Sequence, residues 1–96
     1  MPKGYWIVHI DVKDAENYPK YLAADAKAFE DFNARFLVRG GRHQAVEGPA
    51  RTRHVVIEFE NYDQALACYN SKAYQAAAKL RQAYAESEVL IVEGQA

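Results

Sequence analysis

The strand-like stretch Arg53–Glu60 constrains the fold most, because its two faces differ so clearly. Side chains alternate along a strand, so neighbouring residues point to opposite sides. One face is wholly apolar and consists of Val55, Ile57 and Phe59. The other combines one apolar side chain with polar groups, namely His54, Val56, Glu58 and Glu60. The apolar face predicts a covering layer of helices, while the mixed face suits either solvent or a surface buried around a small polar site.

The segment Gly4–Val12 repeats the same division. Its apolar face consists of Trp6, Val8, Ile10 and Val12, and its other face of Tyr5, Ile7, His9 and Asp11. Two strands with matching faces indicate that both belong to one sheet and share the same covering layer.

Two segments have the spacing of amphipathic helices. The first follows Asp14, a plausible N-cap, and starts between Ala15 and Lys20, where Pro19 suits a first helical turn. Its apolar stripe is Tyr18, Leu22, Ala26, Phe29 and Phe32. The second starts after Asn61, which with Gln64 forms a capping-box pattern, and Asn70-Ser71 interrupts it. Helical spacing then continues through Tyr74, Ala77, Ala78, Arg81 and Tyr84.

Two further strands complete the pattern. Arg35–Arg39 runs into Gly40-Gly41, a glycine pair that marks a bulge, a close approach to the backbone or a simple bend. Strand character resumes at Arg42–Val46 and ends in turn residues 47–50, so the Arg53 strand is expected to return as the second arm of a long hairpin. Glu88–Glu93 is the last strand.

The expected order is strand, helix, strand, strand, helix, strand. With crossovers of one hand, this order predicts an α+β, ferredoxin-like domain over residues 1–96, with both helices on one face of a four-stranded antiparallel sheet. The other face would then expose Ile7, Leu37 and Val56, which no helix of the same chain covers. Because such a face is too apolar for water, we expect a homodimer whose sheets pack against each other.

Composition excludes several classes of function. The 96 residues carry a net charge of −1, which gives no electrostatic reason to bind nucleic acid or an anionic membrane. No signal-peptide pattern and no membrane-spanning apolar run is present, so we expect a cytoplasmic protein. The single Cys68 excludes an internal disulfide and a paired-cysteine metal carrier, and it is expected to be a packed, inert thiol. An RNA-recognition module is also set aside, because it would need exposed aromatic residues on the central strands, whereas the corresponding strand here is His-Val-Val-Ile-Glu-Phe-Glu at 54–60.

The candidate site is on the uncovered sheet face. There His9 could move a proton, Glu58 could orient His9 or act as the base, and Arg39 could hold a carboxylate or enolate oxygen, with Tyr5 and Arg42 nearby. The plainer alternative is that Glu58 and Arg39 form a cross-strand ion pair. Tyr69 and Tyr74 could bind substrate by lining a pocket between helix and sheet, or they could simply be core residues. The spacing of His9, His43 and His54 is not that of a metal site, so neither a metal nor another cofactor is expected.

Several stretches together resemble a bacterial family known as domain of unknown function 1330. They are Gly-Tyr-Trp-Ile at 4–7, Arg-Phe-Leu-Val-Arg-Gly-Gly at 35–41, Val-Val-Ile-Glu-Phe at 55–59, Cys-Tyr-Asn-Ser-Lys-Ala-Tyr-Gln at 68–75, Leu-Arg at 80–81 and Val-Glu-Gly at 92–94. The resemblance implies a dimeric α/β barrel, a superfamily that includes cofactor-free monooxygenases, muconolactone isomerases and haem proteins. It implies no particular reaction. Where the family often has tryptophan, this chain has Cys68-Tyr69, which could alter a pocket wall.

Two hypotheses about function remain. The first is a cofactor-independent enzyme that acts on a small anionic organic molecule by proton transfer or addition. The second is a non-catalytic homodimer that binds a metabolite or serves as an interaction domain. In either case Arg39, beside Gly40-Gly41, is the expected ligand-binding arginine, whereas Arg51 and Arg53 follow a turn and are expected to be solvated.

Overall fold

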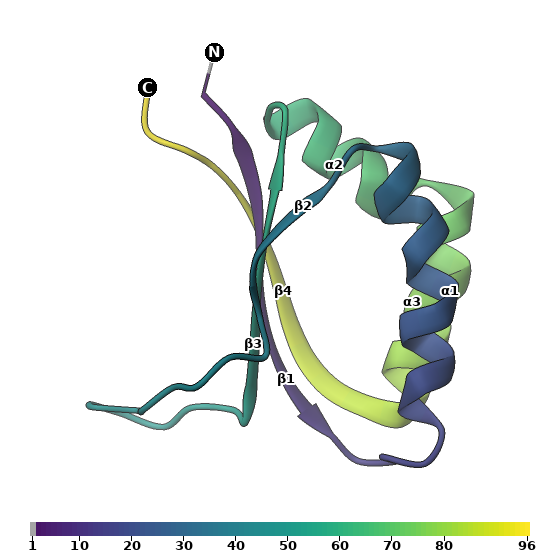
Figure 1. Ribbon diagram of the computed structural model, residues 1–96, viewed down its shortest axis with the longest axis vertical. Coiled ribbons are helices and arrows are strands. Elements are labelled where there is room, and N and C mark those ends of the chain that lie inside the picture. Colours follow the sequence, from purple (N-terminus) through teal and green to yellow (C-terminus); the bar gives the residue numbers. More distant parts are fainter. Residues whose placement is uncertain (1) are drawn as a thin grey trace.

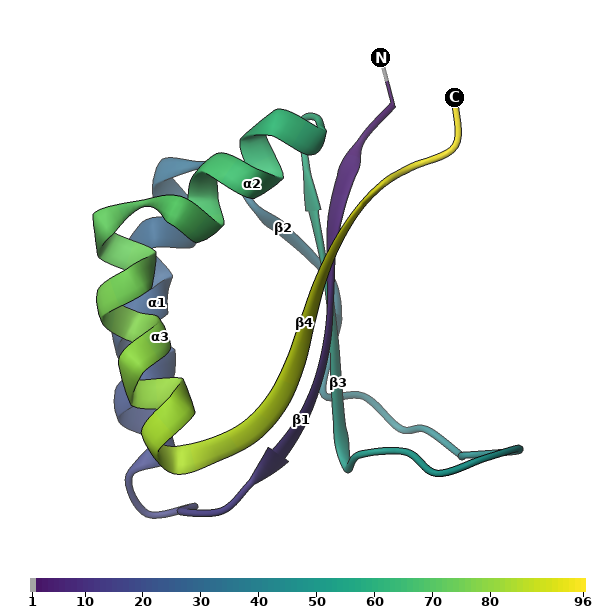
Figure 2. The same cartoon turned by 180° about the vertical axis from the view of Figure 1, so that it is seen from behind.

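The computed structural model describes residues 2–96 and contains one antiparallel sheet with three helices (Figure 1). In chain order, the elements are β1 (Gly4–Val12), α1 (Tyr18–Asp31), β2 (Arg35–Arg39), β3 (Arg53–Phe59), α2 (Tyr62–Asn70), α3 (Lys72–Tyr84) and β4 (Ala85–Glu93). The four strands lie in the order β2-β3-β1-β4, so the ferredoxin-like plan is confirmed. All helices lie on one face of the sheet, and the other face is uncovered in the single chain (Figures 1 and 2).

The core lies between the helices and the predicted apolar face of the central strands. Trp6, Ile57 and Phe59 are each at most 2% exposed, and the register of β1 and β3 pairs Trp6 with Ile57. Trp6 also donates from Nε1 to the backbone oxygen of Ala65, 2.9 Å away. The predicted assignment of faces for β1 and β3 is therefore confirmed.

The second helical segment is two helices separated by Ser71. Asn61 caps α2 by accepting from the backbone N of Gln64, at 2.8 Å, and Ser71 caps α3 by accepting from the backbone N of Tyr74. Each cap satisfies a backbone N–H group that has no partner within its helix. The predicted cap and interruption are confirmed.

Helix α1 differs from its prediction in two ways. It begins at Tyr18 within the predicted range, but Asp14 is not its N-cap: the Asp14 carboxylate accepts from Asn17 in the turn before the helix. Ala26 is exposed, and the buried face is Tyr18, Tyr21, Asp25, Ala28 and Phe29. The helix is thus rotated relative to the predicted stripe, and a carboxylate occupies a core-facing position.

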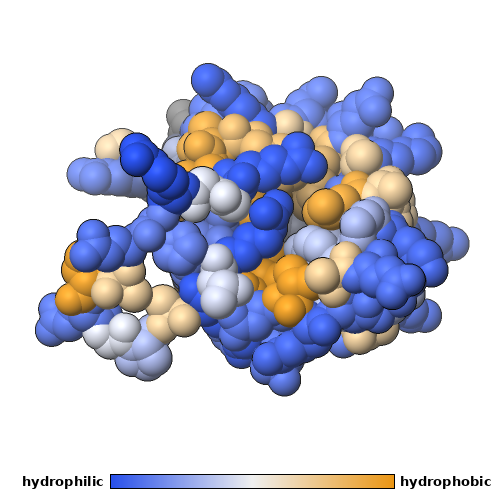
Figure 3. Space-filling view, turned by 60° about the horizontal axis from the view of Figure 1, so that its bottom comes forward, coloured by the Kyte–Doolittle hydropathy of each residue, from blue (hydrophilic) through white to orange (hydrophobic). Residues whose placement is uncertain are grey.

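Two strand boundaries also differ from their predictions. No strand forms at 42–46: β2 ends at Arg39, and Gly40 has a φ of 69°, a left-handed conformation that turns the chain away from β3. Residues 40–50, hereafter the arm, then project on the uncovered side of the sheet (Figures 1 and 3). Strand β4 begins at Ala85, directly after α3 and earlier than predicted.

Strand β2 contains a β-bulge at Leu37. Phe36 pairs with Ile57 and Val38 with Val56, so Leu37 is an extra residue without a partner in β3. A single inserted residue moves every following side chain to the opposite face. Arg39 therefore pairs with Val55 and lies on the helix side of the sheet.

Candidate functional site

The predicted group of His9, Arg39 and Glu58 does not converge in this chain. Arg39 is on the opposite face because of the bulge, which corrects the prediction from strand parity. His9 is opposite His54 and Glu58 is opposite Tyr5, four positions along the same pair of strands. At about 3.3 Å per residue, His9 and Glu58 are roughly 13 Å apart. Neither can therefore orient the other within one chain.

The open-face residues have other partners. The Nδ1 atoms of His9 and His54 are 2.8 Å apart and share a hydrogen bond, and the hydroxyl of Tyr5 donates to Glu58 over 3.4 Å. The ring of His43, from the arm, lies 4.5 Å from the ring of His54. Even so, within residues 2–96 no three side chains of the metal-binding types are arranged to hold an ion.

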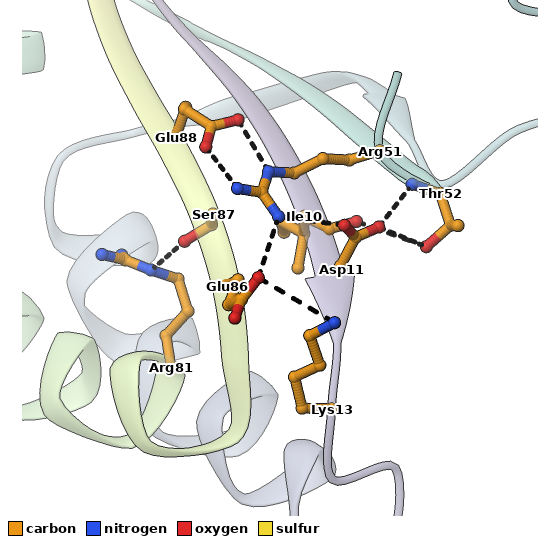
Figure 4. A network of polar contacts seen from close by, with 9 residues as sticks. All are labelled: Ile10, Asp11, Lys13, Arg51, Thr52, Arg81, Glu86, Ser87 and Glu88. Atoms are coloured by element: carbon orange, nitrogen blue, oxygen red, sulfur yellow. Dashed lines mark hydrogen bonds and ion pairs between the residues drawn. The ribbon is translucent and has the colours of Figure 1, made fainter. Parts of the chain in front are cut away.

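Arg51 ties the arm back to the sheet (Figure 4). Its guanidinium donates to Glu88 of β4 at 2.6 and 2.7 Å and to Asp11 of β1 at 2.9 Å. Hydrogen bonds from Thr52 and Arg51 keep the pKa of the Asp11 carboxyl below its usual range. Arg51 is thus an anchor at the root of the arm.

The remaining predicted ligand residues are dispersed. Arg42 is exposed on the arm, Tyr69 packs edge-on against Trp6 with ring centroids 5.7 Å apart, and Tyr74 is 1% exposed. None of the three lines the pocket between the sheet and α1 that is described below, or the hollow beside His9 and His54 on the open face. Cys68 is fully buried, and burial raises its thiol pKa to about 12, in agreement with a packed, unreactive thiol.

A small pocket lies between the sheet and α1, on the helix side. It holds about 20 Å³, enough for one water-sized molecule, and its apolar walls come from the core. Its polar groups come from α1, β2 and β3 and are Tyr18, Tyr21, Asp25, Arg39 and Arg53. We call this site the helix-side pocket.

Asp25 is the only acidic residue that lines the helix-side pocket, and it is 4% exposed. Burial raises its pKa to about 6, while the positive charge of Arg39, a hydrogen-bonding interaction with Tyr21 and the charge of Arg53 oppose that rise. A carboxyl group with a pKa near 6 can accept and return a proton at neutral pH. The pocket therefore combines a base with two cations.

Arg53 corrects the expectation of a solvated side chain. Its Nε atom is buried and has no hydrogen-bond partner. Its guanidinium occupies the space where a Cβ on Gly40 would lie, so the glycine leaves room for it. Arg39 stacks over the ring of Phe36, with Cζ 4.1 Å from the ring centroid. A buried N–H group without a hydrogen-bond partner is costly, so an acceptor that reached it would be stabilising.

A buried chain of polar side chains lies behind the helix-side pocket. Arg81, 4% exposed, donates to the hydroxyl of Tyr74, whose oxygen is 2.8 Å from that of Tyr21. Arg81 also donates from Nε to Ser87 at 3.0 Å. Among the described residues Arg81 has no salt-bridge partner. The hydrogen-bond acceptors of this cation are therefore hydroxyl groups and not a carboxylate.

The family assignment follows from a comparison of the whole sequence. The family described as Domain of unknown function (DUF1330) matches residues 3–95. The chain belongs to this family. Among curated proteins, none matches the sequence. The predicted family is thus confirmed, and DUF1330 carries no reaction in its description.

Solved structures show the same fold at low sequence identity. A protein of unknown function from Rhodopseudomonas palustris is 16% identical, with a TM-score of 0.79 over 99% of this chain and 84% of that one. SnoaB, a cofactor-independent oxygenase from Streptomyces nogalater, is 13% identical, with a TM-score of 0.63 over 100% and 96%. A dimeric protein of unknown function with a ferredoxin-like fold from Bacteroides fragilis is 16% identical, with a TM-score of 0.57 over 95% of each chain. These matches establish the fold of this DUF1330 chain.

Sequence reasoning missed Asp25 and Arg53. A signal for Asp25 was present, because it lies between Tyr21 and Phe29 at four-residue steps, on the stripe that faces the core. Burying a carboxylate at such a position costs free energy, so its presence there indicates a candidate site. Arg53 gave no such signal, since only tertiary structure brings it beside α1.

Proposed function

We propose that this protein binds a small anionic organic molecule in the helix-side pocket and transfers a proton with Asp25 as the base, without a cofactor. The observation that carries the proposal is the combination in one pocket of a carboxyl group of pKa about 6 with Arg39 and with Arg53, whose Nε is unpaired. A ligand oxyanion would receive the guanidinium hydrogen bonds, and its acidic C–H or O–H group would face Asp25.

The fold of SnoaB supports this proposal by analogy, because that neighbour is a cofactor-independent oxygenase. The pocket holds only about 20 Å³ as it stands, so binding an organic acid requires side chains at its rim to move. Arg39 is suited to this, since this residue is exposed and its guanidinium stacks on Phe36, which also lines the pocket.

We also propose that the functional unit is a homodimer formed through the uncovered sheet face. Ile7 and Leu90 pair across β1 and β4 on this face, and Leu90 is 58% exposed. Val38 and Val92, also on this face, are 41% and 39% exposed. An apolar sheet face of this kind favours a second copy, and the neighbour from Bacteroides fragilis is dimeric.

Ligand binding can be tested by thermal stabilisation with a panel of small enolic and aromatic acids. An acid that raises the melting temperature of the wild type should lose its effect with Arg39→Lys and with Arg53→Lys, because a lysine cannot make the bidentate contact. Arg42→Lys on the arm is the matched control and should keep the effect. Loss with His9→Asn but not with Arg39→Lys would place the ligand on the open sheet face instead.

Proton transfer can be tested separately from binding. With a stabilising acid in D₂O, the wild type should exchange the acidic C–H of that ligand, and Asp25→Asn should reduce the exchange by at least 10²-fold while still binding the ligand. Binding without any exchange by the wild type would make the protein a non-catalytic metabolite-binding domain.

A further inference from the structure

We propose that Arg81 and Tyr74 are positioning residues for Asp25, acting through a one-directional chain of hydrogen bonds that ends with Tyr21. This inference rests on the proposed role of Asp25 as the base. The chain is unusual because it begins at a buried cation that has no carboxylate partner among residues 2–96.

The direction of the chain follows from which atoms can donate. A guanidinium has only donors, so the oxygen of Tyr74 must accept from Arg81. The hydroxyl hydrogen of Tyr74, which is 1% exposed, then needs an acceptor, and the oxygen of Tyr21 at 2.8 Å supplies it. Tyr21 is thereby left with its own hydrogen to donate elsewhere.

In the proposed chain Asp25 is the final acceptor, and it lines the same pocket as Tyr21. It follows Tyr21 by one helical turn on the same buried face of α1, and the hydrogen-bonding interaction from Tyr21 lowers the Asp25 pKa. Burial, which raises the pKa of both phenols, keeps them protonated and hence able to donate. The positive end of the chain is therefore Arg81 and the negative end is the Asp25 carboxylate, which lines the pocket.

This arrangement explains why a cation is buried behind the pocket. Each link polarises the next, so Arg81 favours the ionised form of Asp25 without contacting it. Neither Arg81 nor Tyr74 lines the pocket.

The test is the pKa of Asp25 in the unliganded protein, measured by the ¹³C shift of its carboxyl group during a pH titration. Tyr21→Phe removes the donor to Asp25 and should raise the pKa by about one unit, a tenfold change in the proton affinity of Asp25. Tyr74→Phe should raise it by a smaller but measurable amount, although Tyr74 does not touch Asp25. Because phenylalanine keeps the ring packing, both variants should fold.

A double mutant separates a chain from two independent effects. In the Tyr21→Phe background, Tyr74→Phe should produce no further change in the pKa of Asp25, because the link is already broken. Additive changes, or no change with Tyr74→Phe alone, would overturn the proposal. Tyr69→Phe is the control, since it removes a hydroxyl from the same aromatic cluster outside the chain.

Arg81→Met tests the origin of the polarity and should raise the pKa of Asp25 as Tyr74→Phe does. If that variant fails to fold, the two phenylalanine variants still decide the question. The result is also independent of catalysis. An Asp25 pKa that follows the chain, together with an active Asp25→Asn variant, would refute the proposed base and leave the chain intact.

Discussion

At the scale of the residue, the most informative feature is the buried carboxylate of Asp25, whose charge lowers the stability of the fold. Asp25 is buried between the sheet and α1, where its charged form is poorly solvated. Two arginines reduce that cost but do not remove it, since the pKa of Asp25 stays above its ordinary 3.8, at about 6. A residue that a fold retains at such a cost is a candidate for function.

This cost makes a prediction about stability and pH. Because its pKa is raised on folding, Asp25 takes up a proton more readily in the folded state between pH 4 and 6, so its contribution to stability falls as pH rises through that range. Asp25→Asn should therefore raise the free energy of unfolding at pH 7 by about 1–3 kcal/mol. Urea denaturation should show this gain disappearing below pH 4. A variant less stable than the wild type at pH 7 would contradict the raised pKa.

At the scale of the element, the bulge in β2 has the largest consequence. One extra residue, Leu37, moves Arg39 from the open face to the helix side, where it meets Asp25 and Arg53. Gly40 then leaves space for the Arg53 guanidinium and turns the chain into the arm. The presence of both arginines in the helix-side pocket thus depends on one bulge residue in a five-residue strand.

The packing of β3 against the helices gives a second prediction. Ile57 is 2% exposed, so Ile57→Ala removes buried apolar volume and should lower the free energy of unfolding by about 2–5 kcal/mol. Val46→Ala, on the arm at a position 85% exposed, is the control and should change it by less than about 0.5 kcal/mol. Chemical denaturation measures both. Similar effects for the two variants would mean that the covered face of the sheet is assigned wrongly.

At the scale of the whole molecule, the two faces of the sheet have different roles. The helix side holds the core and the helix-side pocket, while the open side presents apolar side chains and the His9–His54 pair. The arm also projects on the open side (Figure 1). No helix within residues 2–96 is long and apolar enough to cross a membrane. A second copy of the chain is the partner that we propose for the apolar part of the open face.

The proposed dimer gives a third prediction. Leu90→Lys places a charge on the open face, in the edge strand β4 beside Ile7, and should increase the monomer fraction at micromolar concentration, because the charge would be buried in the interface. Lys72→Glu, on the far side in α3, also changes charge and should leave the assembly unchanged. Sedimentation velocity distinguishes the two states. A stable, folded wild-type monomer at that concentration would refute the dimer.

The sequence by itself determined the properties that depend on neighbours in the chain. Alternation fixed which face of β1 and of β3 meets the helices, and the side chains of Asn61 and Ser71 set where α2 and α3 begin. These features could be predicted because periodicity and capping act over a few residues.

Only the tertiary structure decided the site. The side of the sheet on which Arg39 lies depends on pairing with β3, because a bulge is invisible to strand alternation until a partner defines the register. Asp25 and Arg53 line the same pocket although they are 28 positions apart in the chain. His9 and His54 likewise become partners only through the register of β1 and β3. Pairing across a sheet and packing of a helix on it are long-range events, and local sequence periodicity carries no record of them.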